Sequence, residues 1–273
     1  MKTSLLITTY NRGHLLNNSL QRLCQLTIPG EVLVVDDGST DNTEQIVKSF
    51  EQKLPIRYIY NHNPEWSICS FARNIGVKNT DADIIITSEP ELMWVTDLVP
   101  QMVGDMDVHP DEIISAGTIY HMQEHCSFHP GFITDPKVAL KDCIVEDYQT
   151  QPRSYDQRGL VKTVNMQATF ACLYKRDWLM EINGWDEEFK GCWGWDDIDL
   201  ATRLRINGIN QHIYWDVECI HQWHPHPPHH IMGEGSRINE AHMRSKRLDL
   251  LEKGDPGLIA NKEKEWGIIK PRV

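Results

Sequence analysis

The feature that most constrains the fold of this chain is the alternation of short apolar segments with amphipathic ones over about its first 100 residues. Segments 4–10, 31–37, 56–61 and 82–89 are rich in the β-branched and aromatic residues that strands favour. Segments 13–26, 38–52 and 67–80 lie between them and carry apolar residues at helical spacing. Such alternation is typical of βαβ units, so the sequence predicts an α/β fold with a mostly parallel central sheet flanked by helices.

The alternation weakens after residue 100. Residues 119–160 are rich in His, Pro, Asp and Gln, and we expect a long insertion over the sheet edge there. A strand and a short helix are predicted within 164–182, and residues 231–273 are charged and helix-prone. We therefore expect one domain over 1–230, with a first half (1–100) and a second half (101–230). A C-terminal helical extension, 231–273, would pack on that domain.

Charge and cysteine usage narrow the class of protein. Lys and Arg total 27 against 39 Asp and Glu, a net charge of -12. This balance argues against broad attraction to nucleic acid or anionic lipid, and it suits a protein that holds a divalent cation. No apolar run approaches the roughly 20 residues that span a bilayer, so we expect no transmembrane segment; peripheral membrane contact and the oligomeric state stay open. Seven scattered cysteines without a CxxC pair favour reduced thiols in a cytoplasmic protein.

Polar residues follow three of the predicted strands, at 8–12, 36–39 and 89–91. Ligands of parallel α/β sheets bind beyond the carboxyl ends of the strands. The three ends should therefore lie at one edge of the sheet, where we expect the two acidic ones to converge. Solvated loop polarity is the plainer alternative.

A crowded acidic stretch stands at 191–204, in GCWGWDDIDLATRL. Gly194 would let the backbone turn tightly between Trp193 and Trp195. Asp196 and Asp197 follow in the first turn of a predicted helix, where the positive end of the helix dipole stabilises ionised acids. The alternative makes the acids simple helix caps and the tryptophans core residues.

Four segments resemble, in order and spacing, the motifs of family-2-type glycosyltransferases with the GT-A fold: ITTYNR (7–12), VVDDGSTDNT (34–43), ARNIGVKNTDADIIITSEPE (72–91) and NGWDEEFKGCWGWDDIDLATRL (183–204). The last is similar to a segment of chondroitin-polymerase-like enzymes and β-1,4-galactosyltransferases. The resemblance spans about 3–225. It implies a Rossmann-like GT-A domain that transfers a hexose or N-acetylhexosamine, with inversion, from a UDP-sugar to a hydroxyl of a glycan or lipid-linked acceptor. The divalent metal would be Mn²⁺ or Mg²⁺.

The resemblance assigns the donor side of the site to five residues. Thr8 and Tyr10 would line the nucleotide pocket, with Arg12 in the same motif. Asp37 would accept a hydrogen bond from the base N–H; a carboxylate accepts but cannot donate, which favours uracil or thymine over cytosine. Arg73 would lie near the diphosphate, and a structural ion pair is the open alternative for it.

The metal motif of the family, Asp-x-Asp, is replaced here by Glu89-Pro90-Glu91. Glutamate still offers the hard oxygens that Mn²⁺ or Mg²⁺ prefer. We expect Glu91 to bind the metal directly and Glu89 to meet the ribose or a metal-bound water. His221 would complete the site, with His224 as the second choice. The remaining members of this histidine cluster are expected to face solvent: His226, His229 and His230. A zinc site and a metal-independent variant stay open.

The resemblance assigns Asp197 as the general base that takes the proton of the acceptor hydroxyl. Asp196 would bind acceptor hydroxyls, while Trp193 and Trp195 would offer flat apolar faces to the acceptor sugar. Asp199 would lie on the helix surface or serve the structure.

Three other functions are weighed against this assignment. One is a nucleotidyltransferase, disfavoured because TTYNRGHL holds a single glycine. Another is a non-catalytic carbohydrate-binding or nucleotide-sugar-binding relative, for which the altered metal motif is the hint. The third is a transferase that glycosylates a modified nucleic-acid base, using a basic groove around 153–176.

Overall fold

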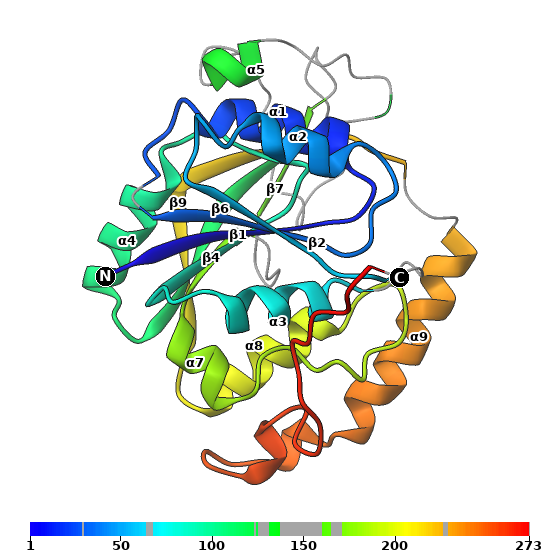
Figure 1. Ribbon diagram of the computed structural model, residues 1–273. Coiled ribbons are helices and arrows are strands. Elements are labelled where there is room, and N and C mark those ends of the chain that lie inside the picture. The colour runs from blue at the N-terminus through cyan, green and yellow to red at the C-terminus, as the bar shows by residue number, and fades with distance from the viewer. Residues whose placement is uncertain are drawn as a thin grey trace.

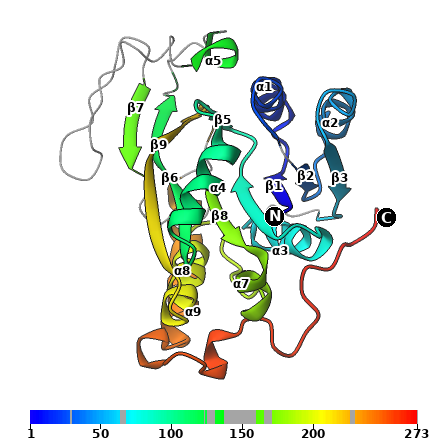
Figure 2. The same ribbon diagram turned by 90° about the vertical axis from the view of Figure 1, so that its left-hand side faces the viewer.

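The computed structural model describes residues 1–28, 30–63, 68–122, 124, 131–136, 160–164, 171–225 and 229–272. One sheet lies between two layers of helices (Figures 1 and 2). Its strands are β1 (Thr3–Thr9), β2 (Glu31–Asp36), β3 (Ile56–Tyr60), β4 (Ile84–Ser88), β5 (Leu92–Trp94), β6 (Glu112–Met122), β7 (Leu160–Val164), β8 (Cys172–Lys175) and β9 (Asn210–His221). The helices are α1 (Gly13–Leu23), α2 (Thr43–Ser49), α3 (Ser70–Asn79), α4 (Leu98–Val108), α5 (Gly131–Thr134), α7 (Arg176–Glu181), α8 (Asp196–Ile206) and α9 (His229–Ser245), with short 3-10 turns at Leu248–Leu250 and Pro256–Leu258.

The sheet runs in the order β3-β2-β1-β4-β8-β6-β9-β5, and β7 pairs with β6. Strands β1 to β4 are mutually parallel, and β6 is parallel to β9. Strands β5, β7 and β8 run in the opposite direction. The predicted α/β fold is confirmed, and its parallel character is complete over residues 3–88, whereas the second half of the sheet is mixed.

Strand β6 runs through residues 119–122, which the sequence had indicated as the start of a patternless insertion. It lies between β8 and β9 and is buried along nearly its whole length, so it needs no alternation of polar and apolar residues. Most of the predicted insertion, 125–130 and 137–159, lies outside the described residues, as do His226 and most of the candidate basic groove at 153–176.

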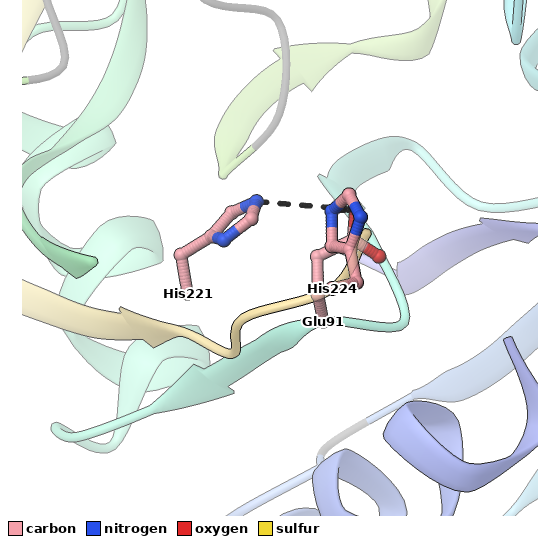
Figure 3. A group of neighbouring side chains, drawn as sticks. All are labelled: Glu91, His221 and His224. Atoms are coloured by element: carbon pink, nitrogen blue, oxygen red, sulfur yellow. Dashed lines mark ion pairs between the residues drawn. The ribbon is translucent and has the colours of Figure 1, made fainter. Parts of the chain in front are cut away.

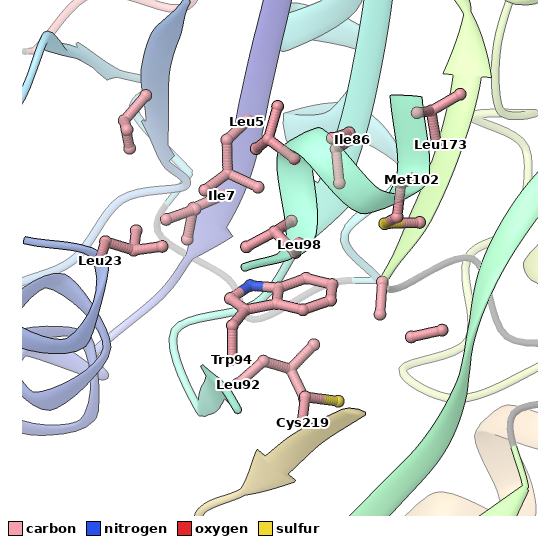
Figure 4. Close-up of a cluster of buried hydrophobic side chains, with 14 of the residues drawn as sticks. Leu5, Ile7, Leu23, Ile86, Leu92, Trp94, Leu98, Met102, Leu173 and Cys219 are labelled. Atoms are coloured by element: carbon pink, nitrogen blue, oxygen red, sulfur yellow. The ribbon is translucent and has the colours of Figure 1, made fainter. Parts of the chain in front are cut away.

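Each face of the sheet has its own apolar core. Successive side chains of a strand point to opposite faces, so Leu5 and Ile7 pack under α1 and α4, while Leu6 packs under α3. Figure 4 shows the first core, where Trp94 of β5 lies among Leu98, Met102 and the strands. The second core gathers side chains of α3, α7 and α8, including Ile75, Leu179, Leu200 and Leu204, together with Trp185 of the loop between α7 and α8.

The segment after residue 228 is helical only in part. Helix α9 confirms the predicted C-terminal helix; it ends at Ser245, and the chain then continues through two short 3-10 turns and irregular backbone. The irregular part returns toward β3: Trp266 is buried in the second core, Lys270 N donates to Asn61 Oδ1 at 2.8 Å, and His62 N donates to Lys270 O at 2.8 Å.

Within the described residues, every helix is too short or too polar to span a bilayer.

Candidate active site at the carboxyl ends of the strands

The loops after β1 and β2 are tied together at one edge of the sheet. Asn11 N donates to Ser39 Oγ and Thr40 N donates to Asn11 Oδ1, each at 2.8 Å. Strand β1 lies between β2 and β4, so the acidic residues that follow β2 and β4 are about 10 Å apart, two strand spacings. The two acidic strand ends therefore share this edge and stand on either side of the β1 end.

On the β3 side of this edge, Asp37 is buried between two amides. Its Oδ1 accepts from Asn61 Nδ2 at 2.7 Å and its Oδ2 from Asn63 Nδ2 at 2.8 Å. Burial raises the pKa of Asp37, and the amide hydrogen bonds oppose that rise. Thr8 is buried at the end of β1, and Tyr10 follows half-buried. Asn61 and Asn63 were not predicted from the sequence, although Asn61 is a polar residue at the end of β3, the same signal that indicated the other strand ends.

On the β4 side, Arg73 of α3 is buried among three carboxylates. Its Nη1 lies 2.9 Å from Asp197 Oδ1 and 3.7 Å from Asp196 Oδ2, and its Nη2 lies 3.1 Å from Glu89 Oε1. The ion-pair alternative for Arg73 is thus observed, and it lies within the candidate site. Residues from α3 and the β4 end meet the start of α8 here, which lies more than 100 positions later in the sequence.

One guanidinium cannot neutralise three carboxylates, so burial and the neighbouring charges raise the pKa of two of them, Asp196 and Glu89. Burial, followed by the charge of Asp197, raises the pKa of Asp196 to about 7. Burial, followed by the charge of Glu91, raises the pKa of Glu89 to about 8. Asp197 is the most exposed of the three, with 28% of its side chain accessible. Asp196 instead faces inward, and its Oδ2 accepts a hydrogen bond from Ser70 Oγ at 3.1 Å. Only 4% of its side chain is exposed to an acceptor sugar.

The turn before α8 has the shape that the sequence indicated, with added strain. Gly194 has φ +75°, and Trp195 has φ +76°, a left-handed conformation that costs a non-glycine residue about 1–2 kcal/mol. Trp195 Nε1 donates to Ser236 Oγ at 3.1 Å, while Trp193 is 49% exposed beside it. Trp193 therefore presents a flat apolar surface to solvent, and Trp195 is anchored to α9.

A single side chain of α9 holds this turn. Asn239 is fully buried; its Oδ1 accepts from Gly191 N at 2.8 Å, and its Nδ2 lies within 3.2 Å of the carbonyls of Gly191, Trp193 and Gly194. Asn239 and Ser236 were not predicted from the sequence, because residues 231–273 were expected to form an outer extension. Asp199 is structural: it is fully buried, 2.7 Å from Arg203 Nε and paired with Lys246.

Glu91, His221 and His224 form a group with the composition of a metal site (Figure 3). Pairing of Leu92 with His221 brings β5 against the end of β9. Glu91 Oε1 lies 3.3 Å from His224 Nε2 and 3.9 Å from His221 Nε2. Both histidines considered from the sequence thus stand beside Glu91, whereas Glu89 turns to Arg73.

Three observations fit a divalent cation to this group. Glu91 Oε2 is buried and, among the described residues, makes no hydrogen bond. Burial acts to raise the pKa of Glu91, but the hydrogen bond from His224 and the charges of both histidines hold that pKa below its usual range. One ligand atom from each of Glu91, His221 and His224 lies within 4.8 Å of the others. One carboxylate and two imidazoles suit Mn²⁺ and other transition metals better than Ca²⁺.

Arg12 supplies a further positive charge at the same place. Its Nη2 lies 3.3 Å from His224 Nδ1. A guanidinium beside a cation site can bind phosphate oxygens, because both groups favour an anion between them.

Comparison with known proteins supports the same fold and family. Chondroitin synthases of Pasteurella multocida and Escherichia coli are each 27% identical, over 75% and 99% of this chain, and the chain spans only 23% and 41% of their lengths. The crystal structure of S. aureus TarS 1-349 in complex with UDP-GlcNAc superposes with a TM-score of 0.60 at 15% identity, covering 83% of this chain and 60% of that one. The mannosyltransferase PcManGT from Pyrobaculum calidifontis, in complex with GDP-Man and Mn²⁺, gives 0.56 at 18% identity, covering 94% and 67%.

These likenesses establish the GT-A fold that the motifs implied. The family model for "Glycosyl transferase family 2" matches residues 4–182, a span that includes the three polar strand ends and Arg73. With a match over more than half of its length, the chain belongs to glycosyl transferase family 2.

Proposed function

We propose that this protein is an inverting glycosyltransferase that moves a hexose or N-acetylhexosamine from a UDP-sugar to a hydroxyl of a glycan or lipid-linked acceptor. The observation that carries the proposal is the position of Asp197, which is 28% exposed at the start of α8 and pairs with Arg73, on the same edge of the sheet as the Glu91, His221 and His224 group. A carboxylate open to an acceptor and a cation site for a diphosphate are the two parts that the reaction needs.

Asp197 would act as the general base. The acceptor oxygen forms a bond to the anomeric carbon while the bond from that carbon to the diphosphate oxygen breaks, and the hydroxyl proton passes to Asp197. Arg73, 2.9 Å from Asp197 Oδ1, orients that carboxylate. The exposed ring of Trp193 would stack on C–H bonds of the acceptor sugar. Asp196 would position Arg73 and the start of α8 from inside.

A Mn²⁺ or Mg²⁺ ion held by Glu91, His221 and His224 would neutralise charge on the leaving diphosphate. Arg12 would add a second positive charge beside it. Asp37 would accept from the N–H of the base, with Asn61 and Asn63 holding its carboxylate in place. TarS was solved with UDP-GlcNAc and the chondroitin synthases are polysaccharide-forming relatives, which favours a UDP-sugar and a glycan acceptor.

A donor panel tests the proposal. UDP- and GDP-sugars are incubated with Mn²⁺, and released nucleotide is measured, since slow hydrolysis reveals the donor without the acceptor. We expect release from a UDP-hexose or UDP-N-acetylhexosamine. Release from GDP-sugars alone would contradict the uracil assignment of Asp37.

The same assignment predicts that Asp37→Ala weakens UDP binding by about 1.5–3 kcal/mol.

Calorimetry of UDP with and without Mn²⁺ tests the metal. We expect Mn²⁺ to tighten UDP binding in the wild type, and His221→Ala to remove that gain while leaving metal-free binding nearly intact. His14→Ala, which changes an exposed histidine of α1, is the matched control. Equal UDP affinity with and without metal in the wild type would take the cation out of the mechanism.

A further inference from the structure

A second group of metal-ligating side chains lies at the opposite end of β9 from His221. Asp105 and His109 stand one turn apart at the end of α4, and His212 is near the start of β9. His212 precedes His221 by nine positions in one strand, which separates the two groups by about 30 Å. This second group is therefore distinct from the candidate active site.

The contacts within this group are close. Asp105 Oδ2 lies 3.3 Å from His212 Nε2, and Glu112 Oε2 lies 2.9 Å from His109 Nδ1 and 3.7 Å from His212 Nδ1. One ligand atom from each of Asp105, His109 and His212 lies within 4.8 Å of the others. The two imidazole rings are stacked, with centroids 3.8 Å apart and planes at 16°.

The positions of the imidazole nitrogens relative to Asp105 and Glu112 suit a cation. If both Nδ1 atoms carry protons toward Glu112, each Nε2 keeps a lone pair, and that of His212 faces a carboxylate oxygen of Asp105. Asp105 Oδ2 is buried and makes no hydrogen bond to any described residue. Two lone pairs set against each other repel, and a metal ion between them removes the repulsion. The group also lies at the carbonyl end of α4, where the helix dipole favours positive charge.

We propose that Asp105, His109 and His212 bind a divalent transition-metal cation, with Zn²⁺ the best fit, and that Glu112 positions both imidazoles from behind. Two imidazoles and one carboxylate match zinc chemistry, with water as the fourth ligand, whereas Ca²⁺ and Mg²⁺ prefer all-oxygen shells. Ligand atoms around a tetrahedral zinc are about 3.4 Å apart. The ligand atoms here, now within 4.8 Å of one another, would therefore approach each other by little more than about an ångström.

Binding requires the stacked rings to turn, because parallel rings cannot direct two in-plane lone pairs at one point. Each histidine side chain is about one-third exposed, at 33% for His109 and 31% for His212, which leaves room for that turn and for the water ligand. The ion would then clamp the end of α4 to the starts of β6 and β9, joining residues about 100 positions apart in sequence.

Zinc titration of tag-free, nucleotide-free protein tests the site. The starting variant carries both His221→Ala and His224→Ala, so that the first group no longer binds. We expect this variant to bind one Zn²⁺ per chain, and adding His212→Ala or His109→Ala to abolish that binding. Glu112→Gln should weaken it by 10–100-fold, as expected of a residue that orients metal ligands. His14→Ala, added to the same background, should change nothing.

Two further readouts keep the test decisive. Co²⁺ should give the visible absorption of a tetrahedral site in the background variant and not after His109→Ala. Saturating Zn²⁺ should raise the Tm of the background variant by about 5 °C or more, a rise that adding His212→Ala should remove. The metal-free Tm of each variant reports whether it folds, and His109→Gln replaces any variant that does not. Absence of bound zinc in the background variant, or zinc binding that survives both His109→Ala and His212→Ala, overturns the proposal.

Discussion

Arg73 is the residue on which the charge balance of the site depends, because it is the partner of the proposed base. Replacing Asp197 by Asn keeps the shape of the side chain and its contact with the guanidinium, but an amide cannot take a proton at neutral pH. We expect Asp197→Asn to lower transfer by about 10²-fold or more and to leave UDP affinity within a few fold.

Steady-state kinetics and calorimetry on the same preparation measure the two effects of Asp197→Asn. Asp249→Asn, an exposed change outside the site, is the matched control. Transfer within a few fold of wild type would remove Asp197 from the role of base.

The raised pKa of Asp196 has a measurable effect on stability. Between its ordinary value of 3.8 and about 7, the folded protein binds a proton at this carboxyl that the unfolded chain has released. Stability therefore falls as pH rises through this window. Asp196→Asn has no charge to bury, so its Tm should fall less than that of the wild type between pH 5 and pH 8, and should be the higher of the two at pH 8. Thermal unfolding in chelator at both pH values measures the difference, and parallel behaviour of the two proteins would contradict the assignment.

At the scale of elements, the turn at 191–195 depends on α9. Asn239→Ala would leave the buried N–H of Gly191 and nearby carbonyls without their partner, at about 1–3 kcal/mol for such a group. We expect the turn to loosen and to misplace Asp197, lowering kcat by roughly tenfold while UDP affinity holds. Arg237→Ala, an exposed change on the same helix, is the control. Loss of UDP affinity together with kcat would instead indicate general unfolding.

The sequence predicted these elements unevenly, for physical reasons. Strands β1, β2 and β4 and the residues at their ends carry local signals: β-branched runs followed by polar turns. Glu91 lies just after β4, whereas His221 was assigned from the family resemblance, and their role in binding metal stays a prediction. Strand β6 was missed because a strand buried on both faces has no alternation. Asn239 was missed because one polar residue in a charged helix has no local signal, and its partners lie more than 40 positions away.

At the scale of the whole molecule, the last residues connect to the nucleotide side of the site. Lys270 N donates to Asn61 Oδ1, and Asn61 Nδ2 donates to Asp37 Oδ1. Removing residues 270–273 should free the Asn61 side chain and weaken UDP binding by several fold, without changing its response to Mn²⁺. Trp266 stays in the second core, so the Tm should move by only a few degrees. Calorimetry compares the two chains, and unchanged UDP affinity would show that this connection does not matter for the nucleotide.

The pairing of β5 with β9 determines when during folding the cation group can form. Strands β1 to β4 all lie within residues 3–88 and can pair early, whereas Glu91 must wait for His221, 130 positions later. Contacts so distant in sequence form late, because a long loop must close first. A chain that is still being synthesised can therefore have its Asp37 pocket before it has any affinity for metal. The rise in Mn²⁺ affinity during refolding should then follow the pairing of β5 with β9. Its rate would report a late step in the folding of this enzyme.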